Sequence, residues 1–144
     1  TNMSRTHYVA DWMTSPVETL SPNSSVLEAV YLLKSKGVRL APVVSDDKLV
    51  GLISDRDLRK DITDLNSFDI KNIYIKNGDA PVSDYMETDV RIITPEDSIV
   101  TACNILVANR IHGLPVVADD ESSKLVGVIT KTDLLEALLF LDQD

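Results

Sequence analysis

Apolar residues recur at intervals of three and four positions in two stretches of the chain. They are Val26, Leu27, Ala29, Val30 and Leu33 in the first stretch, and Ile99, Val100, Ala102, Cys103 and Leu106 in the second. This spacing predicts two amphipathic helices, and we expect Cys103, on the apolar face of the second helix, to lie in the core. Ser25 followed by Glu28 predicts a capping box at the start of the first helix, and Gly37 predicts a left-handed residue at its end.

Short continuous apolar runs follow each of these stretches and predict buried strands. The runs cover residues 40–44 and 49–53 in the first half of the chain, and residues 114–117 and 125–129 in the second half. A short extended segment precedes each helix, at residues 17–20 and 90–93. A second helix is expected to begin near Ser54 and near Thr130, so that each half has the element order β-α-β-β-α.

The two halves are copies of one sequence repeat. Val9-Ala-Asp-Trp-Met13 recurs as Val82-Ser-Asp-Tyr-Met86, an offset of 73 positions (82 minus 9). After three extra residues near Glu121, Lys48-Leu-Val-Gly-Leu-Ile53 recurs as Lys124-Leu-Val-Gly-Val-Ile129, an offset of 76 (124 minus 48). We therefore place a first motif at residues 8–61, a connector at residues 62–80 and a second motif at residues 81–141.

A single copy is expected to be only marginally stable alone, because about 60 residues bury only a modest share of their surface. The sequence therefore predicts an α+β fold in which two βαββα repeats pack sheet to sheet about a pseudo-twofold axis. Such packing leaves clefts where strand ends and helix starts of both copies converge, and ligands commonly bind in clefts of this kind.

The amino-acid composition argues against several classes of binding partner and function. The 144 residues include 14 Lys and Arg against 23 Asp and Glu, a formal net charge of −9, which argues against nucleic acid or an anionic membrane surface. No apolar run approaches the roughly 18–20 residues needed to cross a bilayer. One cysteine cannot form an internal disulfide, which indicates a cytoplasmic protein. Two histidines and one cysteine offer no metal-ligand spacing, and no catalytic motif is present, so we expect neither a metal site nor an enzyme.

Several motifs agree in order and spacing in both halves. The first half contains Met13-Thr-Ser-Pro-Val17, Ala41-Pro-Val-Val44 and Leu49-Val-Gly-Leu-Ile-Ser-Asp-Arg-Asp-Leu58. The second half repeats them through Met86, Gly113-Leu-Pro-Val-Val117, Leu125-Val-Gly-Val-Ile-Thr130 and Asp133-Leu134. From residue 8 to residue 141 the chain resembles a tandem pair of cystathionine-β-synthase (CBS) domains, also called a Bateman module, including the small stand-alone proteins of the acetoin-utilisation type.

The resemblance implies a regulatory module that binds an adenosine-containing ligand (AMP, ADP, ATP or S-adenosylmethionine) in a cleft between the two motifs. It implies no required cofactor, a homodimer formed through helices, and a regulated protein that the sequence does not identify. The alternative is a CBS pair that binds no ligand and serves only as a dimerisation module.

In this family the aspartate of a Ser/Thr-x-x-Asp element holds the ribose hydroxyls, which maps onto Ser54 with Asp57 and onto Thr130 with Asp133. The same element at a helix start is also typical of a capping box, and one residue can serve both roles. The resemblance places the adenine beside the turn after the Met-Thr element of the opposite copy. It also places a basic residue near the phosphate, at Arg39 or at His112.

Two sets of ligand-binding residues follow from this correspondence. The preferred cleft is expected to contain Ser15, Pro16, Val17, Ile111, His112, Thr130, Thr132 and Asp133. The second cleft is expected to contain Thr88, Val90, Val38, Arg39, Ser54, Arg56 and Asp57. The preference rests on Glu87 and Asp89, which replace Thr14 and Pro16 and add negative charge that repels a phosphate.

Overall fold

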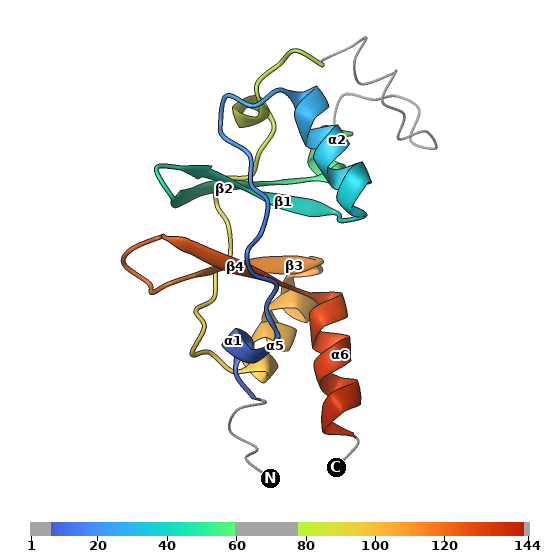
Figure 1. Ribbon diagram of the computed structural model, residues 1–144, viewed down its shortest axis with the longest axis vertical. Helices are drawn as coiled ribbons and strands as arrows, with labels where there is room; N and C mark the ends of the chain where they lie inside the picture. The colour runs from blue at the N-terminus through green and yellow to red at the C-terminus, as the bar shows by residue number, and fades with distance from the viewer. Residues whose placement is uncertain (1–6, 60–77, 143–144) are drawn as a thin grey trace. The chain divides into compact units, whose positions relative to one another are not determined.

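A computed structural model describes residues 7–59 and 78–142 of the chain. The chain divides into two compact units (Figure 1). Unit 1 contains residues 1–17 and 91–144, and unit 2 contains residues 18–90. Most of the expected connector, residues 62–77, lies outside the described residues. Among the described residues, no helix has the length and apolar character needed to cross a membrane.

Unit 2 is built on an antiparallel hairpin. Strand β1 (Leu40–Ser45) pairs with β2 (Lys48–Ser54) from Leu40 opposite Ser54 to Ser45 opposite Lys48, with a register shift between Val43 and Val44. Helix α2 (Val26–Lys36) precedes the hairpin, and α3 (Asp55–Leu58) follows it directly. A short 3-10 turn, η2 (Val82–Asp84), lies in the segment that returns to the hairpin.

Unit 1 repeats this plan in the second half of the chain. Strand β3 (Gly113–Val117) pairs antiparallel with β4 (Leu125–Thr130), again with a register shift near the end of the first strand. Helix α5 (Ile99–Asn109) precedes the hairpin and α6 (Lys131–Leu141) follows it. A single helical turn, α1 (Val9–Trp12), comes from the first half of the chain. The structure is therefore an α+β protein of two β-α units, each with a small two-stranded sheet.

The predicted first strand of each repeat is reduced to one parallel bridge. Leu20 N–H donates to the Pro42 carbonyl (3.0 Å), and Val44 N–H donates to the Leu20 carbonyl (2.8 Å). The next bonds of a parallel ladder would need the N–H groups of residues 22 and 42, and both are proline. In unit 1, Pro95 and Pro115 limit the Ile93–Val116 bridge in the same way.

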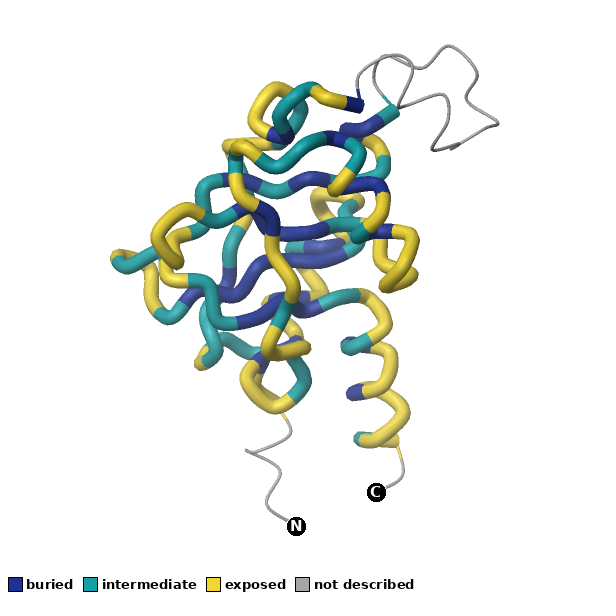
Figure 2. The backbone as a smooth tube through the Cα atoms, turned by 45° about the horizontal axis from the view of Figure 1, so that its top comes forward, coloured by how far each residue is buried: buried dark blue, intermediate teal, exposed yellow. Residues whose placement is uncertain are grey.

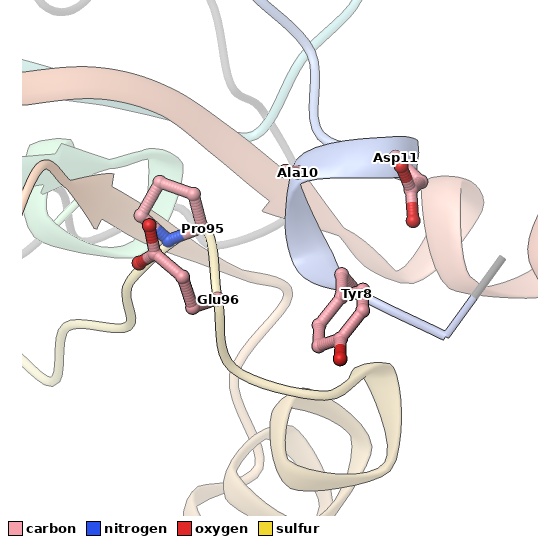
Figure 3. A pocket seen from close by; sticks show the side chains of 5 residues that line it. All are labelled: Tyr8, Ala10, Asp11, Pro95 and Glu96. Atoms are coloured by element: carbon pink, nitrogen blue, oxygen red, sulfur yellow. The ribbon is translucent and has the colours of Figure 1, made fainter. Parts of the chain in front are cut away.

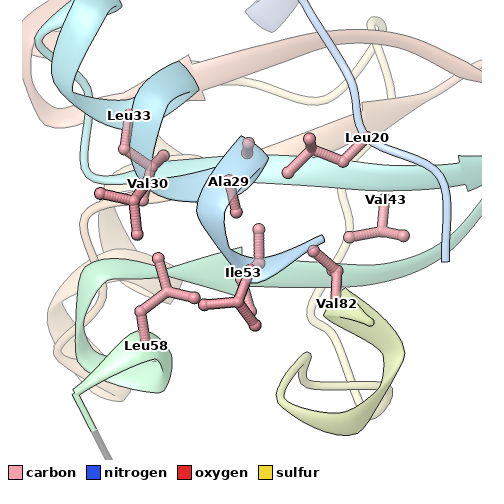
Figure 4. Close-up of a cluster of buried hydrophobic side chains, with 10 residues drawn as sticks. Leu20, Ala29, Val30, Leu33, Val43, Ile53, Leu58 and Val82 are labelled. Carbon is pink, nitrogen blue, oxygen red and sulfur yellow. The ribbon is translucent and has the colours of Figure 1, made fainter. Parts of the chain in front are cut away.

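Each unit has its own apolar core. The core of unit 2 (Figure 4) consists of Leu20, Val26, Ala29, Val30, Leu33, Ala41, Val43, Ile53, Leu58 and Val82. The core of unit 1 consists of Val9, Ile93, Ile99, Ala102, Leu106, Leu114, Val116, Ile129, Leu134 and Ala137. Val9 in unit 1 and Val82 in unit 2 occupy equivalent repeat positions, so each core is completed by a segment from the opposite sequence motif.

The predicted helix ends are confirmed, but the predicted burial of Cys103 is wrong. Ser25 and Glu28 form the capping box, and Gly37 ends α2 in the left-handed conformation. Cys103 is exposed because α5 buries the narrow stripe formed by Ile99, Ala102 and Leu106, which leaves Val100, Cys103 and Val107 outside it. The helix before the C-terminus is likewise exposed along most of its length (Figure 2).

The segment that enters each unit crosses its hairpin at a glycine. In unit 1, Thr14 N–H donates to the Val128 carbonyl (2.8 Å) and Val128 N–H donates to the Thr14 carbonyl (3.0 Å). In unit 2, Glu87 and Leu52 exchange the equivalent pair of bonds (2.8 and 2.9 Å). We call residues 13–17 and 86–90 the crossing segments. They put one end of each sequence motif beside the hairpin of the other motif.

We predict that Arg110→Gly stabilises the protein. Arg110 ends α5 with φ 54°, whereas the equivalent residue of α2 is Gly37 with φ 64°. Glycine removes the steric cost of this conformation, so we expect a gain of about 1 kcal/mol in the free energy of unfolding, measured by urea denaturation.

Two control variants separate backbone strain from charge. Arg110→Ala removes the charge but keeps the backbone strain, so we expect no gain in the free energy of unfolding. Gly37→Ala introduces the same strain at a position where an added Cβ would meet nothing within 4 Å, and should therefore destabilise the protein. A gain in Arg110→Ala equal to that in Arg110→Gly would contradict the prediction.

Candidate functional site

The junction of β4 and α6 forms the centre of the candidate site in unit 1. Thr130 is the N-cap of α6, and its hydroxyl oxygen accepts a hydrogen bond from Asp133 N–H (3.2 Å). In return, Asp133 Oδ2 accepts from Thr130 N–H (2.8 Å) and from the Thr130 hydroxyl (3.0 Å). The capping interpretation of this Thr-x-x-Asp element is therefore confirmed, and the carboxylate of Asp133 is fixed at the first turn of an 11-residue helix.

The crossing segment of unit 1 brings a further hydroxyl to this carboxylate. Thr14 Oγ1 donates to Asp133 Oδ1 (3.3 Å) and Oδ2 (3.4 Å), although the two residues are 119 positions apart. These distances are long for a hydroxyl bonded to a carboxylate, so the interaction is weak. The next residue, Ser15, donates its hydroxyl to the Val126 carbonyl on β4 (2.8 Å). The crossing segment is thus anchored to both β4 and the start of α6.

The loop before β3 closes the same site. Lys131 N–H, at the first position of α6, donates to the His112 carbonyl (3.0 Å). His112 and Ile111 are half-buried, whereas Thr132 is exposed in the first turn of the helix. Pro16 is exposed and Val17 is half-buried, directly after Ser15.

All eight residues predicted for the preferred cleft therefore belong to unit 1. Hydrogen bonds join His112, Thr130 and Asp133 at the β4–α6 junction, and Ser15 is bonded to Val126 within β4. Ile111, Pro16, Val17 and Thr132 flank these residues along the chain. Thr14 was not predicted among the binding residues. Two features of the sequence pointed to Thr14: it belongs to the Met-Thr element, and Glu87 replaces it in the other copy.

Unit 2 has the equivalent arrangement. Asp57 Oδ2 accepts from Ser54 N–H (2.9 Å) and from the Ser54 hydroxyl (2.9 Å), and Asp57 N–H donates to Ser54 Oγ (3.2 Å). Asp55 N–H donates to the Arg39 carbonyl (3.0 Å), as Lys131 does to His112. All seven residues predicted for the second cleft belong to unit 2. Val38, Arg39, Arg56 and Thr88 are exposed there, and Val90 is half-buried.

The two sites differ in the accessibility of their carboxylates. Asp57 is 4% exposed and is the only buried charged residue in the described part of the chain, whereas Asp133 is half-buried. A ligand hydroxyl has to reach a carboxylate oxygen to be bound, so the carboxylate of unit 1 is the more accessible acceptor.

A separate shallow depression of about 410 Å³ lies in unit 1, lined by Tyr8, Ala10, Asp11, Pro95 and Glu96 (Figure 3). It shares no residue with the candidate site. Across residues 7–59 and 78–142, the structure groups no three His, Cys, Asp or Glu side chains in a way that would hold a metal ion.

We predict that Gly127→Ala disturbs the site through the backbone of the crossing segment. A Cβ at residue 127 would lie 2.9 Å from the Thr14 carbonyl oxygen and 2.9 Å from Met13 Sδ. The side chain of Met13 can move, but the carbonyl can move only with its segment. We therefore expect a loss of about 1–3 kcal/mol in unfolding free energy and faster amide hydrogen exchange at Thr14 and Val128.

Gly37→Ala is the matched control, because it destabilises the protein at a position remote from both crossing segments in the sequence. In Gly37→Ala, hydrogen exchange at the amides of Thr14 and Val128 should be no faster than the loss of global stability accounts for. Unchanged exchange at these two amides in Gly127→Ala would show that the close approach is not a constraint.

Comparison with known proteins gives one consistent result. The family model of the CBS domain matches residues 9–64 and 82–140. The chain is 32% identical over 126 residues to the CBS domain-containing protein YhcV of Bacillus subtilis, a match that covers 88% of this chain and 81% of YhcV. It is 39% identical over 127 residues to the inosine-5'-monophosphate dehydrogenase of Thermoplasma acidophilum, covering 88% of this chain and 22% of that enzyme.

Solved structures agree with this result. CBSX2, a CBS-pair protein of Arabidopsis thaliana, has been solved in complex with AMP. This complex matches the chain with a TM-score of 0.75 and 29% identity, over 94% of this chain and 98% of CBSX2. The chain thus spans nearly all of some relatives but a minor part of others, including 39% of the protein MJ1232 of Methanocaldococcus jannaschii.

Proposed function

Because the chain belongs to the CBS domain family and carries two such domains in tandem, we propose that it is a non-catalytic regulatory module that binds an adenosine-containing ligand. The candidates are AMP, ADP, ATP and S-adenosylmethionine, and the preferred site is that of unit 1. The observation that carries the proposal is the weak contact of Thr14 with the capped, half-buried carboxylate of Asp133. The AMP complex of CBSX2 supports the choice of ligand class.

The chemistry of Asp133 suits a ribose diol. A carboxylate offers about four acceptor positions, and the cap uses Oδ2 for two hydrogen bonds from Thr130. Thr14 reaches Oδ1 at 3.3 Å, well beyond the usual distance of about 2.7–2.8 Å for a hydroxyl bonded to an oxygen. Two ligand hydroxyls can therefore replace a weak interaction with stronger, charge-assisted bonds while the helix cap stays intact.

Groups for the rest of the ligand lie on the neighbouring elements. The N-terminus of α6 presents the positive end of the helix dipole to a phosphate, and Lys131 adds a charge there. Ser15, Pro16 and Val17 provide the turn beside which the adenine would lie, and Ile111, His112 and Thr132 would complete the site. In unit 2, Thr88, Val90, Val38, Arg39, Ser54, Arg56 and Asp57 would form the weaker site.

Thermal unfolding tests the ligand class directly. We expect millimolar AMP, ADP, ATP or S-adenosylmethionine to raise the melting temperature, because a ligand at about 100 times its dissociation constant stabilises the native state by roughly 2.7 kcal/mol. GMP and inorganic phosphate serve as controls and should give no comparable shift. No shift with any adenosine compound would favour the alternative, a dimerisation module that binds no ligand.

We predict that Asp133→Asn weakens binding of the active ligand by about 1–3 kcal/mol, measured by calorimetric titration. The matched control is Asp97→Asn. Asp97 also belongs to a Thr-x-x-Asp element of unit 1, and its Oδ2 accepts from Thr94 N–H (2.9 Å) and the Thr94 hydroxyl (3.1 Å), yet it is not a site residue. Equal losses of affinity in both variants would identify the effect as general destabilisation.

We also propose that the protein forms a homodimer through the exposed apolar faces of its unit 1 helices. Leu135, Leu138 and Leu139 on α6 are 60%, 62% and 66% exposed, and Val107 on α5 is 77% exposed. Adjacent exposed apolar side chains of this kind are typical of interaction surfaces, because their contact with water is unfavourable and is removed when two copies associate.

Leu138→Lys should therefore shift the protein from dimer to monomer in sedimentation-velocity experiments at micromolar concentration. Glu121→Lys is the control, because it places a lysine at an exposed position of the β3–β4 turn, away from both helices. A wild-type protein that sediments as a monomer would contradict the proposed dimer, and a dimer unaffected by Leu138→Lys would contradict the proposed surface.

A further inference from the structure

Among the differences between the two candidate sites is one at a position whose backbone is held by equivalent hydrogen bonds in both units. Thr14 is bonded to Val128 in unit 1, and Glu87 is bonded to Leu52, the equivalent residue, in unit 2. Both pairs use two backbone hydrogen bonds of 2.8–3.0 Å. We call residues 14 and 87 the crossing position. Because the backbone is fixed alike, the side chain at this position begins at an equivalent place relative to the capping aspartate of its unit.

Unit 1 shows what a side chain at the crossing position reaches. The Thr14 hydroxyl contacts both oxygens of Asp133. Glu87 therefore brings a carboxylate toward the site formed around Asp57, where unit 1 has a neutral hydroxyl. Glu87 is an exposed residue.

The other charged residues at equivalent positions increase the difference in charge between the two sites. The positions are residues 14–17, 111–112 and 130–133 in unit 1, and residues 87–90, 38–39 and 54–57 in unit 2. Unit 2 has two arginines against four carboxylates, a net charge of −2, whereas unit 1 has one lysine against one carboxylate and is neutral with His112 uncharged. A phosphate therefore meets net repulsion in unit 2 that it does not meet in unit 1.

We propose that the crossing position decides which unit accepts a phosphorylated adenosine ligand: Thr14 admits it to unit 1, and Glu87 excludes it from unit 2. This inference rests on the proposed function and specifies the ligand class and the stoichiometry of its sites. One AMP binds per chain, in unit 1, and residues 14 and 87 are specificity-determining residues.

The chain contains a built-in reporter for the test. Trp12 is the sole tryptophan of the sequence and lies two residues before Thr14, on the segment that enters unit 1. Its indole contacts the ring of Phe140 on α6, with centroids 5.5 Å apart. We therefore expect tryptophan fluorescence to respond to a ligand in unit 1, while calorimetric titration counts all AMP bound per chain.

The experiment titrates AMP and adenosine into the full chain and its variants. For wild type we expect one equivalent of AMP, accompanied by a change in Trp12 fluorescence. Thr14→Glu should weaken AMP binding by about tenfold or more and adenosine binding far less, because only AMP carries the repelled phosphate. Thr14→Gln has the same side-chain length without the charge and should retain most of the AMP affinity.

The reciprocal variant tests unit 2. Glu87→Thr should add a second, weaker equivalent of AMP that leaves the Trp12 signal unchanged. The effect of Thr14→Glu on AMP should also shrink at about 1 M NaCl, where charge interactions are screened beyond about 3 Å.

Several results would overturn the inference. These are two equal AMP sites in wild type, equal losses of AMP affinity in Thr14→Glu and Thr14→Gln, equal losses for AMP and adenosine, or no second equivalent in Glu87→Thr. Wild-type protein that binds neither AMP nor adenosine would overturn the proposed function and this inference with it. Binding without the charge dependence would overturn the inference alone.

Discussion

The crossing of a backbone segment over a hairpin glycine is the constraint on which both candidate sites depend. In each unit, the sequence Leu-Val-Gly places a residue without a side chain under the incoming segment. An added Cβ at Gly51 would lie 2.6 Å from Met86 Sδ and 2.9 Å from the Glu87 carbonyl oxygen. The two hydrogen bonds of the crossing require this close approach. They deliver Thr14 to Asp133, and they hold Glu87 at the equivalent place in unit 2.

The same geometry explains why the sequence motif and the compact unit do not coincide. Unit 1 begins with residues of the first motif, and unit 2 ends with residues of the second. Proline residues on both sides of the Leu20–Val43 bridge prevent a longer ladder at the entry to unit 2. The segment therefore makes a single bridge and continues to the next element.

Local features of the fold could be predicted from the sequence because they depend on neighbouring residues. The capping box of Ser25, the left-handed Gly37 and the paired strands all follow from residues within a few positions of one another. The exposure of Cys103 could not be predicted in this way. Val30, at the equivalent position of α2, is buried, so the apolar pattern alone does not decide which of two adjacent stripes faces the core.

The candidate site was predictable in its residue types but not in its contacts. The repeat identified Asp133 and Asp57 as equivalent, yet the structure leaves one half-buried and the other 4% exposed. The contact of Thr14 with Asp133 spans 119 positions, and no local pattern signals a contact of that kind. The turn after Thr14 was predicted as part of the site, but Thr14 itself, whose side chain the structure brings to the carboxylate, was not.

The Ser/Thr-x-x-Asp element by itself does not identify a binding site, because the helix cap accounts for it fully. Thr94 and Asp97 form the same pair of bonds outside the candidate site, and Ser54 and Asp57 form them around a carboxylate that is almost inaccessible. Capping occupies one oxygen of the carboxylate and fixes the direction of the other. The proposed ligand site therefore depends on a second feature, a segment from elsewhere in the chain that places a neutral side chain beside a half-buried capping carboxylate. In the described residues, this combination occurs at Asp133 and Thr14.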